Sequence, residues 1–155
     1  MHKVNKSNYK KALSKYASGI TVTSINHEGV YIGKTVNSFS SLSLVPPLVL
    51  FSLDKKSSSL TKFKKSKNIG ISLLSNKQIE ISKNFAKKNS NWNSTKYFLT
   101  RNNIPLIKNC VANLACKNIK NFPFGDHIVF ICKVEKIKID ELKKPLIYLK
   151  NKYII

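Results

Sequence analysis

Apolar positions in the first part of the chain change from a helical to a strand-like spacing. Between Ser7 and Ala17, apolar or aromatic residues recur three and four positions apart among lysines, which predicts an amphipathic helix. Gly19 is placed to end that helix. The segments Ile20 to Ile25 and Val30 to Lys34 are rich in β-branched residues and are joined by a short polar loop. Together they predict a β-hairpin.

The middle of the chain mixes short apolar runs with short lysine-rich segments. Leu48 to Leu53 is a nearly continuous apolar run after Pro46 and Pro47, which predicts a strand that starts beyond the prolines and is buried on both faces. Two lysine-rich segments with a few apolar residues predict amphipathic helices on either side of another strand. The expected helices are Ser57 to Lys67 and Lys77 to Lys87, and the strand is Ile69 to Leu74.

Two long strands are predicted near the C-terminus, at Val111 to Ile119 and His127 to Ile139. In the second, the apolar positions change parity near Glu135 and Lys136, which predicts a β-bulge there. The chain therefore contains six or more strands, a few short helices and no regular alternation between the two. This order favours an antiparallel β-barrel over a doubly wound parallel sheet.

Composition limits the fold to one compact domain and raises a question about charge. A chain of 155 residues with 42% apolar residues can bury a single core, and we expect one domain over residues 1–155. The net charge of +21 is compatible with a nucleic-acid partner. However, Arg101 is the only arginine, and the lysines are scattered with no run longer than two. We therefore favour a solvated lysine surface and expect no nucleic-acid partner.

Other features exclude several classes of site and location. No apolar stretch approaches the length of a membrane span, and the N-terminus lacks the apolar middle of a signal peptide, so we expect a cytoplasmic protein without a membrane partner. The histidines His2, His27 and His127 have no spacing typical of zinc ligands, and no metal site is expected. The cysteines form no C-x-x-C pair and are expected to be reduced core residues: Cys110, Cys116 and Cys132.

Two polar segments are candidates for ligand binding. Residues Gly33 to Leu48 are dense in hydroxyl and amide side chains, which suit the edge of a flat heteroaromatic ring. The alternative is a crossover loop whose side chains bond their own backbone. Ser57, Ser58 and Ser59 follow two lysines at a predicted helix start and could hold a phosphate, or they could simply cap the helix.

The order of these motifs resembles the flavin reductase-like family, whose members have an FMN-binding split barrel. The resemblance begins with a helix-to-strand motif at Tyr9 to Val22 and continues with G-x-T-x-N-S-F-S-S-x-S-x-x-P-P-L-V-L at Gly33 to Leu50. Further matching segments are Leu53 to Leu60, Asn84 to Ala86, Pro105 to Leu106, Gly125 to His127 and Pro145 to Tyr148. The resemblance extends to Tyr153. It implies a mainly β fold, an antiparallel Greek-key split β-barrel with a few short helices.

The same resemblance implies an enzyme and a set of site residues. Similar proteins are homodimeric NAD(P)H:flavin oxidoreductases that reduce FMN or FAD with NADH or NADPH and supply a flavin-dependent monooxygenase. His127 is the implied catalytic residue on the nicotinamide side. The implied flavin-binding and nicotinamide-side residues are Thr35, Val36, Asn37, Ser38, Phe39, Ser40, Ser52, Ser57, Ser59, Phe85 and Tyr153. The competing hypotheses are a flavin-binding protein without efficient turnover and a basic nucleic-acid-binding protein.

Some positions depart from the family pattern or lack an assigned role. Lys34 stands where the family usually has an apolar residue, and Phe124 stands where a glycine often precedes the Gly-Asp-His motif. Near the C-terminus, lysines replace the usual arginines, which changes how a nucleotide phosphate would be held. The polar segment after the second predicted helix carries three aromatic residues that we expect to pack against a second subunit: Trp92, Tyr97 and Phe98.

Overall fold

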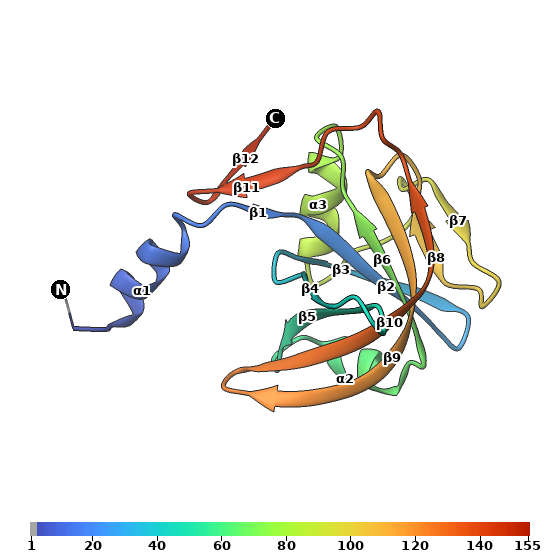
Figure 1. Ribbon diagram of the computed structural model, residues 1–155, viewed down its shortest axis with the longest axis horizontal. Helices are drawn as coiled ribbons and strands as arrows, with labels where there is room; N and C mark the ends of the chain where they lie inside the picture. The colour runs from blue at the N-terminus through green and yellow to red at the C-terminus, as the bar shows by residue number, and fades with distance from the viewer. Residues whose placement is uncertain (1–2) are drawn as a thin grey trace.

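The computed structural model describes residues 3–155 and is dominated by one seven-stranded antiparallel sheet (Figure 1). Its strand order is β3-β2-β6-β9-β10-β5-β4. The strands are β2 (Thr21–His27), β3 (Val30–Val36), β4 (Ser40–Ser43), β5 (Leu48–Asp54), β6 (Asn68–Leu73), β9 (Ala112–Phe124) and β10 (His127–Ile139). The mainly β, antiparallel class predicted from the sequence is confirmed.

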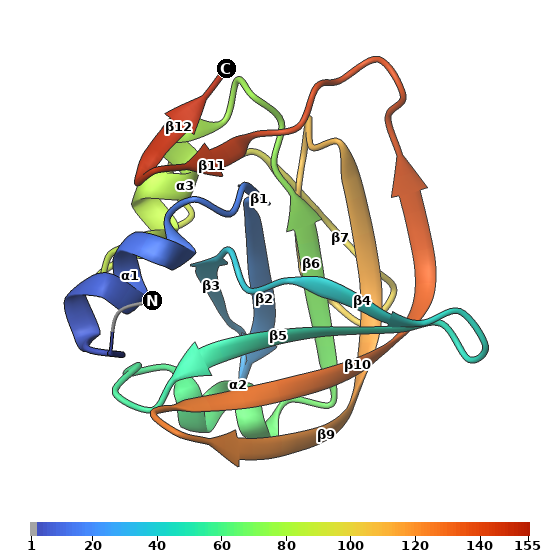
Figure 2. The same cartoon turned by 60° about the vertical axis from the view of Figure 1, so that its left-hand side comes forward.

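The sheet curls until its two ends meet. Strand β3 forms one edge of the sheet, β5 lies next to the other edge, and the two strands contact each other. Figure 2 shows β4 and β5 running across β2 and β6 at a steep angle. A sheet that curls in this way brings the end of β3 beside the end of β5, although neither strand is hydrogen-bonded to the other.

Smaller elements cover the ends of this sheet. The three-stranded sheet consists of β1 (Ser18–Gly19), β11 (Ile147–Leu149) and β12 (Lys152–Ile154), and a separate pair consists of β7 (Tyr97–Leu99) and β8 (Pro105–Ile107). The helices are α1 (Lys6–Leu13), α2 (Leu60–Lys65) and α3 (Ile79–Ala86). Helix α3 packs against β3 and β2, whereas α1 projects from the body of the molecule (Figure 1).

Several local predictions are confirmed by the strand pairing. Strands β2 and β3 form the expected hairpin, and the register of β10 on β9 shifts between Val134 and Lys136, where the parity change predicted a bulge. The prediction that β5 is buried on both faces is wrong. Val49, Phe51 and Leu53 are buried, but the other face, which includes Ser52, is only half-buried. That half-buried face borders the cleft described below.

Helix α1 is shorter than the amphipathic helix predicted from the sequence, and its apolar face is not buried. A capping box between Asn5 and Asn8 starts it, and it ends at Leu13, well before Gly19, which lies in β1. Within Lys6–Leu13 no residue is buried, and the side chains of Tyr9 and Leu13 are 56% and 55% exposed. The apolar positions of this helix therefore find no core within the protomer.

The buried side chains form two clusters. The larger lies inside the curled sheet, where the rings of Phe51 and Phe130 stack with their centroids 4.9 Å apart. The second lies beneath α3 and includes Phe85, against which Trp92 packs at a centroid distance of 4.7 Å. Trp92 packs on this cluster and contacts the ring of Tyr97 at a centroid distance of 5.3 Å, so both residues have partners inside the subunit. That they and Phe98 also pack against a second subunit stays a prediction.

Residues 3–155 contain all three cysteines of the chain and two of its three histidines. Cys110, Cys116 and Cys132 are all buried and unpaired, as predicted for core residues. Within the described residues, no group of three or more histidine, cysteine or acidic side chains could hold a metal ion; His2 lies outside them. In the same part of the chain, no helix is both long and apolar enough to span a membrane.

Candidate functional site

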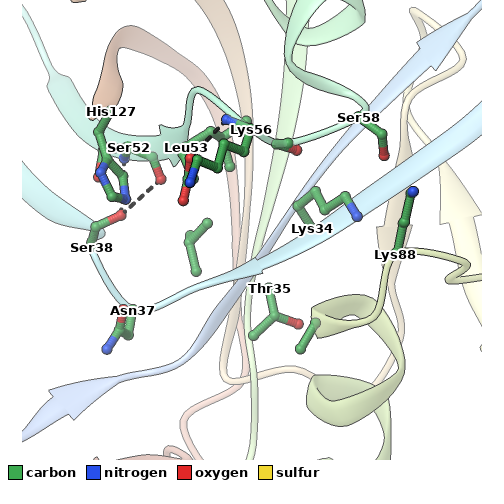
Figure 3. Close-up of a pocket in the computed structure, with 14 residues that line it drawn as sticks. Lys34, Thr35, Asn37, Ser38, Ser52, Leu53, Lys56, Ser58, Lys88 and His127 are labelled. Atoms are coloured by element: carbon green, nitrogen blue, oxygen red, sulfur yellow. Dashed lines mark hydrogen bonds between the residues drawn. The ribbon is translucent and has the colours of Figure 1, made fainter. Parts of the chain in front are cut away.

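A cleft of about 480 Å³ opens where the ends of β3 and β5 meet the C-terminal end of α3 (Figure 3). Its walls come from four parts of the chain, namely β3 with the loop after it, the end of β5 with the turn after it, the end of α3, and the start of β10. The lining residues are Lys34, Thr35, Val36, Asn37, Ser38, Ser52, Leu53, Asp54, Lys56, Ser57, Ser58, Ala86, Lys88 and His127. A volume of this size is typical of a small-molecule or cofactor site.

The loop between β3 and β4 is clamped onto β5 by one serine. The Ser52 amide donates to Ser38 Oγ at 2.9 Å, and Ser38 Oγ donates to the Ser52 carbonyl at 3.2 Å. Residues 37–39 lie between the paired strands, so the sheet does not use their backbone N–H groups. The clamp holds this loop against β5, and Asn37 and Ser38 of the loop line the cleft.

Helix α3 is fixed to β3 by side chains of β3 itself. Thr35 Oγ1 donates to the Ser82 carbonyl at 2.7 Å, and Lys34 Nζ donates to the Lys87 carbonyl at 3.1 Å. Gly33 allows the close approach, because a Cβ at this position would lie 2.6 Å from Cδ1 of Phe85. A small residue at this point of β3 thus places the end of α3 against the cleft.

The turn after β5 is tied to the turn between β9 and β10. The Lys55 amide donates to the Asp126 carbonyl at 2.9 Å, and the Ser57 amide donates to the Asp54 carbonyl at 2.9 Å. Among the described residues, Ser59 at the start of α2 makes no side-chain capping hydrogen bond; its hydroxyl lies 3.2 Å from that of Ser57. The helix-capping interpretation of these serines is therefore not supported for Ser59.

His127 enters the cleft from the first position of β10, directly opposite Asp54 of β5. Its Nδ1 lies 2.7 Å from Oδ1 of Asp126, a contact that orients the imidazole ring. The hydrogen bond and the charge of His127 lower the pKa of the Asp126 carboxyl. His127 is 43% exposed, so its ring is accessible from solvent.

Charge in the cleft is predominantly positive. Among the described residues that line it, three are lysines, Lys34, Lys56 and Lys88, and one is acidic, Asp54. The Asp54 carboxylate accepts a hydrogen bond from the Lys56 amide at 2.7 Å. Burial lowers the pKa of Lys34, because a partly desolvated ammonium is less stable than one in water. An anionic ligand would offset this penalty.

Most of the residues expected from the sequence meet at this cleft. Thr35, Val36, Asn37, Ser38, Ser52, Ser57 and His127 line it. The sequence analysis gave Ser58 as a candidate phosphate ligand, although the family resemblance did not imply it. The analysis assigned no binding role to Leu53, Asp54, Lys56, Ala86 and Lys88. Ser58 is adjacent to the serines that were chosen, and Lys88 follows the Asn84 to Ala86 motif closely. For Lys88, only the packing of α3 on β3 shows that it reaches the cleft.

The other expected residues lie outside the lining of this cleft. Phe39 packs on the larger core cluster, and the Ser40 hydroxyl donates to the carbonyl of Ser41 at 3.1 Å. Ser59 is buried behind Ser57, and Phe85 is fully buried beneath α3. The Tyr153 hydroxyl lies 3.0 Å from Oγ of Ser82, on α3. In the protomer Ser59 contacts the wall through Ser57, and Phe85 and Tyr153 contact it through α3.

This chain is similar in sequence and in structure to known flavin reductases. A sequence model described as Flavin reductase like domain matches residues 13–154. An NADH-dependent flavin reductase from Rhodococcus sp is 33% identical over 142 residues, which cover 90% of this chain and 80% of that protein. The reductase component of 4-hydroxyphenylacetate 3-monooxygenase from Thermus thermophilus is 30% identical over 149 residues, covering 94% and 93%. The structure of flavin reductase PheA2 superposes with a TM-score of 0.90 at 33% identity and covers 97% of both chains.

Proposed function

Because this chain belongs to the flavin reductase-like domain family, we propose that it is an NAD(P)H-dependent flavin reductase whose flavin lies in the cleft between β3, β5 and α3. The observation that carries the proposal is the division of the cleft into two chemically different ends. Figure 3 shows Ser38, Ser52 and His127 at one end, and Lys34, Ser58 and Lys88 at the other. A flavin nucleotide has the same polarity, with a flat heteroaromatic ring at one end and a phosphate at the other.

The residues present fit such a group. The ring end supplies fixed backbone N–H groups of residues 37–39, held by the clamp between Ser38 and Ser52. The opposite end supplies the hydroxyls of Ser57 and Ser58 together with lysine ammonium groups. Hydroxyl and N–H donors suit the carbonyl and nitrogen edge of the ring, and cations with hydroxyls suit a phosphate. The donor set therefore matches FMN or FAD along its length.

The bound flavin supplies the redox chemistry, by accepting hydride at N5 from NADH or NADPH. The residues of this chain bind and position. Donors at Asn37 to Phe39 stabilise the negative charge that reduction places on the ring edge. The curled sheet holds the ring surface so that the nicotinamide can approach one face in a reactive orientation. No nucleophilic side chain of the protein is required for this transfer.

His127 is proposed to contact the nicotinamide. It stands at the ring end of the cleft, it is accessible from solvent, and Asp126 fixes its orientation. An imidazole in this position can form a hydrogen bond with the hydride donor. Phe85 and Tyr153 act from behind the cleft wall in the protomer, through α3. Ser59 acts through the hydroxyl of Ser57.

A partner monooxygenase receives the reduced flavin in this proposal. The Thermus thermophilus relative is named as the reductase component of a monooxygenase. We also propose a homodimer, supported by the exposed apolar side chains of α1, which have no core to join within the protomer. Residues 1–155 form one domain in this proposal, and the three unpaired cysteines suit the reducing cytoplasm.

Steady-state oxidation of NADH with FMN or FAD in excess over the protein tests the function. We expect NADH consumption that requires flavin, is proportional to protein concentration and continues for many turnovers. Flavin binding without turnover would support the flavin-binding alternative. Salt-sensitive retention on DNA together with no flavin binding would support the nucleic-acid alternative and reject this proposal.

A further inference from the structure

We propose that Lys34 and Lys88 form a binding site for a terminal phosphate monoester, and that this site makes FMN the preferred flavin over FAD. The inference rests on the proposed function, because it names the flavin that the cleft takes. Lys34 comes from β3, and Lys88 follows the C-terminal end of α3, so the site joins two elements that are distant in sequence.

The two side chains converge on the same end of the cleft. Figure 3 shows Lys34 and Lys88 pointing toward the same region beside Ser58, away from His127. The hydrogen bond from Lys34 Nζ to the Lys87 carbonyl, at 3.1 Å, holds the ammonium at the cleft wall. An ammonium has three N–H donors, so two remain for a ligand. The placement of Lys34 is therefore set before any ligand arrives.

Nothing negative at this end balances the two ammonium groups among the residues that line the cleft. Asp54 is the acidic lining residue within the described chain, and its carboxylate accepts from the Lys56 amide in the turn after β5. Lys34 is half-buried and Lys88 is exposed, and two ammonium groups at one end of a cleft gain from an anion between them. Burial lowers the pKa of Lys34, and an anion beside its ammonium group would offset this cost of desolvation.

The chemistry of the phosphate decides which flavin gains most. A phosphate monoester such as that of FMN carries a charge of about −1.5 to −2 at pH 7. Each phosphate of a dinucleotide such as FAD is a diester-like group with a charge of about −1, and riboflavin has no phosphate. Two neighbouring ammonium groups therefore favour FMN over FAD, and FAD over riboflavin.

The test compares the affinities of FMN, FAD and riboflavin in the wild type, Lys34→Met and Lys88→Met. Lys133→Met is the matched control. Lys133 is exposed in the middle of β10, and it pairs with Leu48, which lies at the opposite end of β5 from the residue paired with His127. We expect each cleft variant to weaken FMN by about tenfold and FAD by less, with riboflavin within about twofold of the wild type. The control should match the wild type for all three ligands.

The affinity for riboflavin distinguishes the loss of a phosphate contact from a displacement of α3. Loss of the hydrogen bond from Lys34 to the Lys87 carbonyl would displace α3 and weaken the binding of all three flavins. Lys88→Met makes the test independent of that bond. Wild-type affinities that are equal for FMN and FAD, or variants that leave the FMN-to-riboflavin preference unchanged, would overturn this inference while flavin reduction by the wild type still stood. A wild type that binds no flavin would reject the proposed function as well.

Discussion

Ser38→Ala is expected to loosen the loop that presents N–H donors to the flavin ring. The Ser38 hydroxyl makes two hydrogen bonds with the Ser52 backbone, at 2.9 Å and 3.2 Å, and alanine removes both. A hydrogen bond contributes about 0.5–1.5 kcal/mol net, so the free energy of unfolding should fall by about 1–3 kcal/mol. In a chain of about this size each kcal/mol lowers Tm by about 2–4 °C.

Thermal denaturation without flavin measures this loss, and flavin titration of the same variant measures its consequence. Ser40→Ala is the matched control, since the exposed Ser40 hydroxyl bonds only the neighbouring Ser41 carbonyl within the described structure. We expect Ser38→Ala to have a lower Tm than the control and a weaker affinity for flavin. Equal Tm values for the two variants would refute the clamp, and unchanged flavin affinity would refute the role of residues 37–39.

The other predictions concern α3, the nicotinamide side and the core. Gly33→Ala should lower stability by about 1–3 kcal/mol and weaken flavin binding, because the new Cβ would overlap Phe85, whereas Gly19→Ala, with no atom within 4 Å of its Cβ, should not. Thermal denaturation measures the change in stability of each variant, and flavin titration measures the change in its affinity for flavin. His127→Ala should lower kcat/KM for NADH by about tenfold to a hundredfold with flavin affinity unchanged, and His27→Ala should leave both unchanged; an equal fall in flavin affinity would contradict the assignment. Burial raises the pKa of Cys110 from its ordinary 9.0 to about 12, so native stability should decrease as pH rises above about 9, where the unfolded thiol ionises and the folded one does not. Thiol labelling at pH 8 should be slow in the native protein and fast after unfolding.

Strand periodicity predicted the sheet well, because parity is a local property of the sequence. The change of parity in β10 predicted the bulge, and the β2–β3 hairpin was evident from its β-branched segments. Burial on one face of a helix is not local in this way. The spacing around Tyr9 and Leu13 predicts an apolar face, but whether that face meets a core depends on where the helix lies, and α1 lies away from the body.

The same limit applies to the aromatic residues and the site. A single aromatic residue in a polar segment, such as Trp92, does not indicate which residue it packs against. Its partner Phe85 is near in the sequence, but the contact is seen only in the structure. The motif at Thr35 to Ser38 located the cleft, since these residues are consecutive at the end of β3 and the start of the loop after it. Lys88 could not be assigned to the same cleft from its spacing, because only the packing of α3 on β3 brings it there.

A crystal structure of the protein with FMN tests the central claim most directly. The account predicts the ring beside residues 37–39 and Ser52, and the phosphate at the opposite end, near Ser57, Lys34 and Lys88. FMN bound in another cavity, or bound here with the phosphate beside His127, would contradict it.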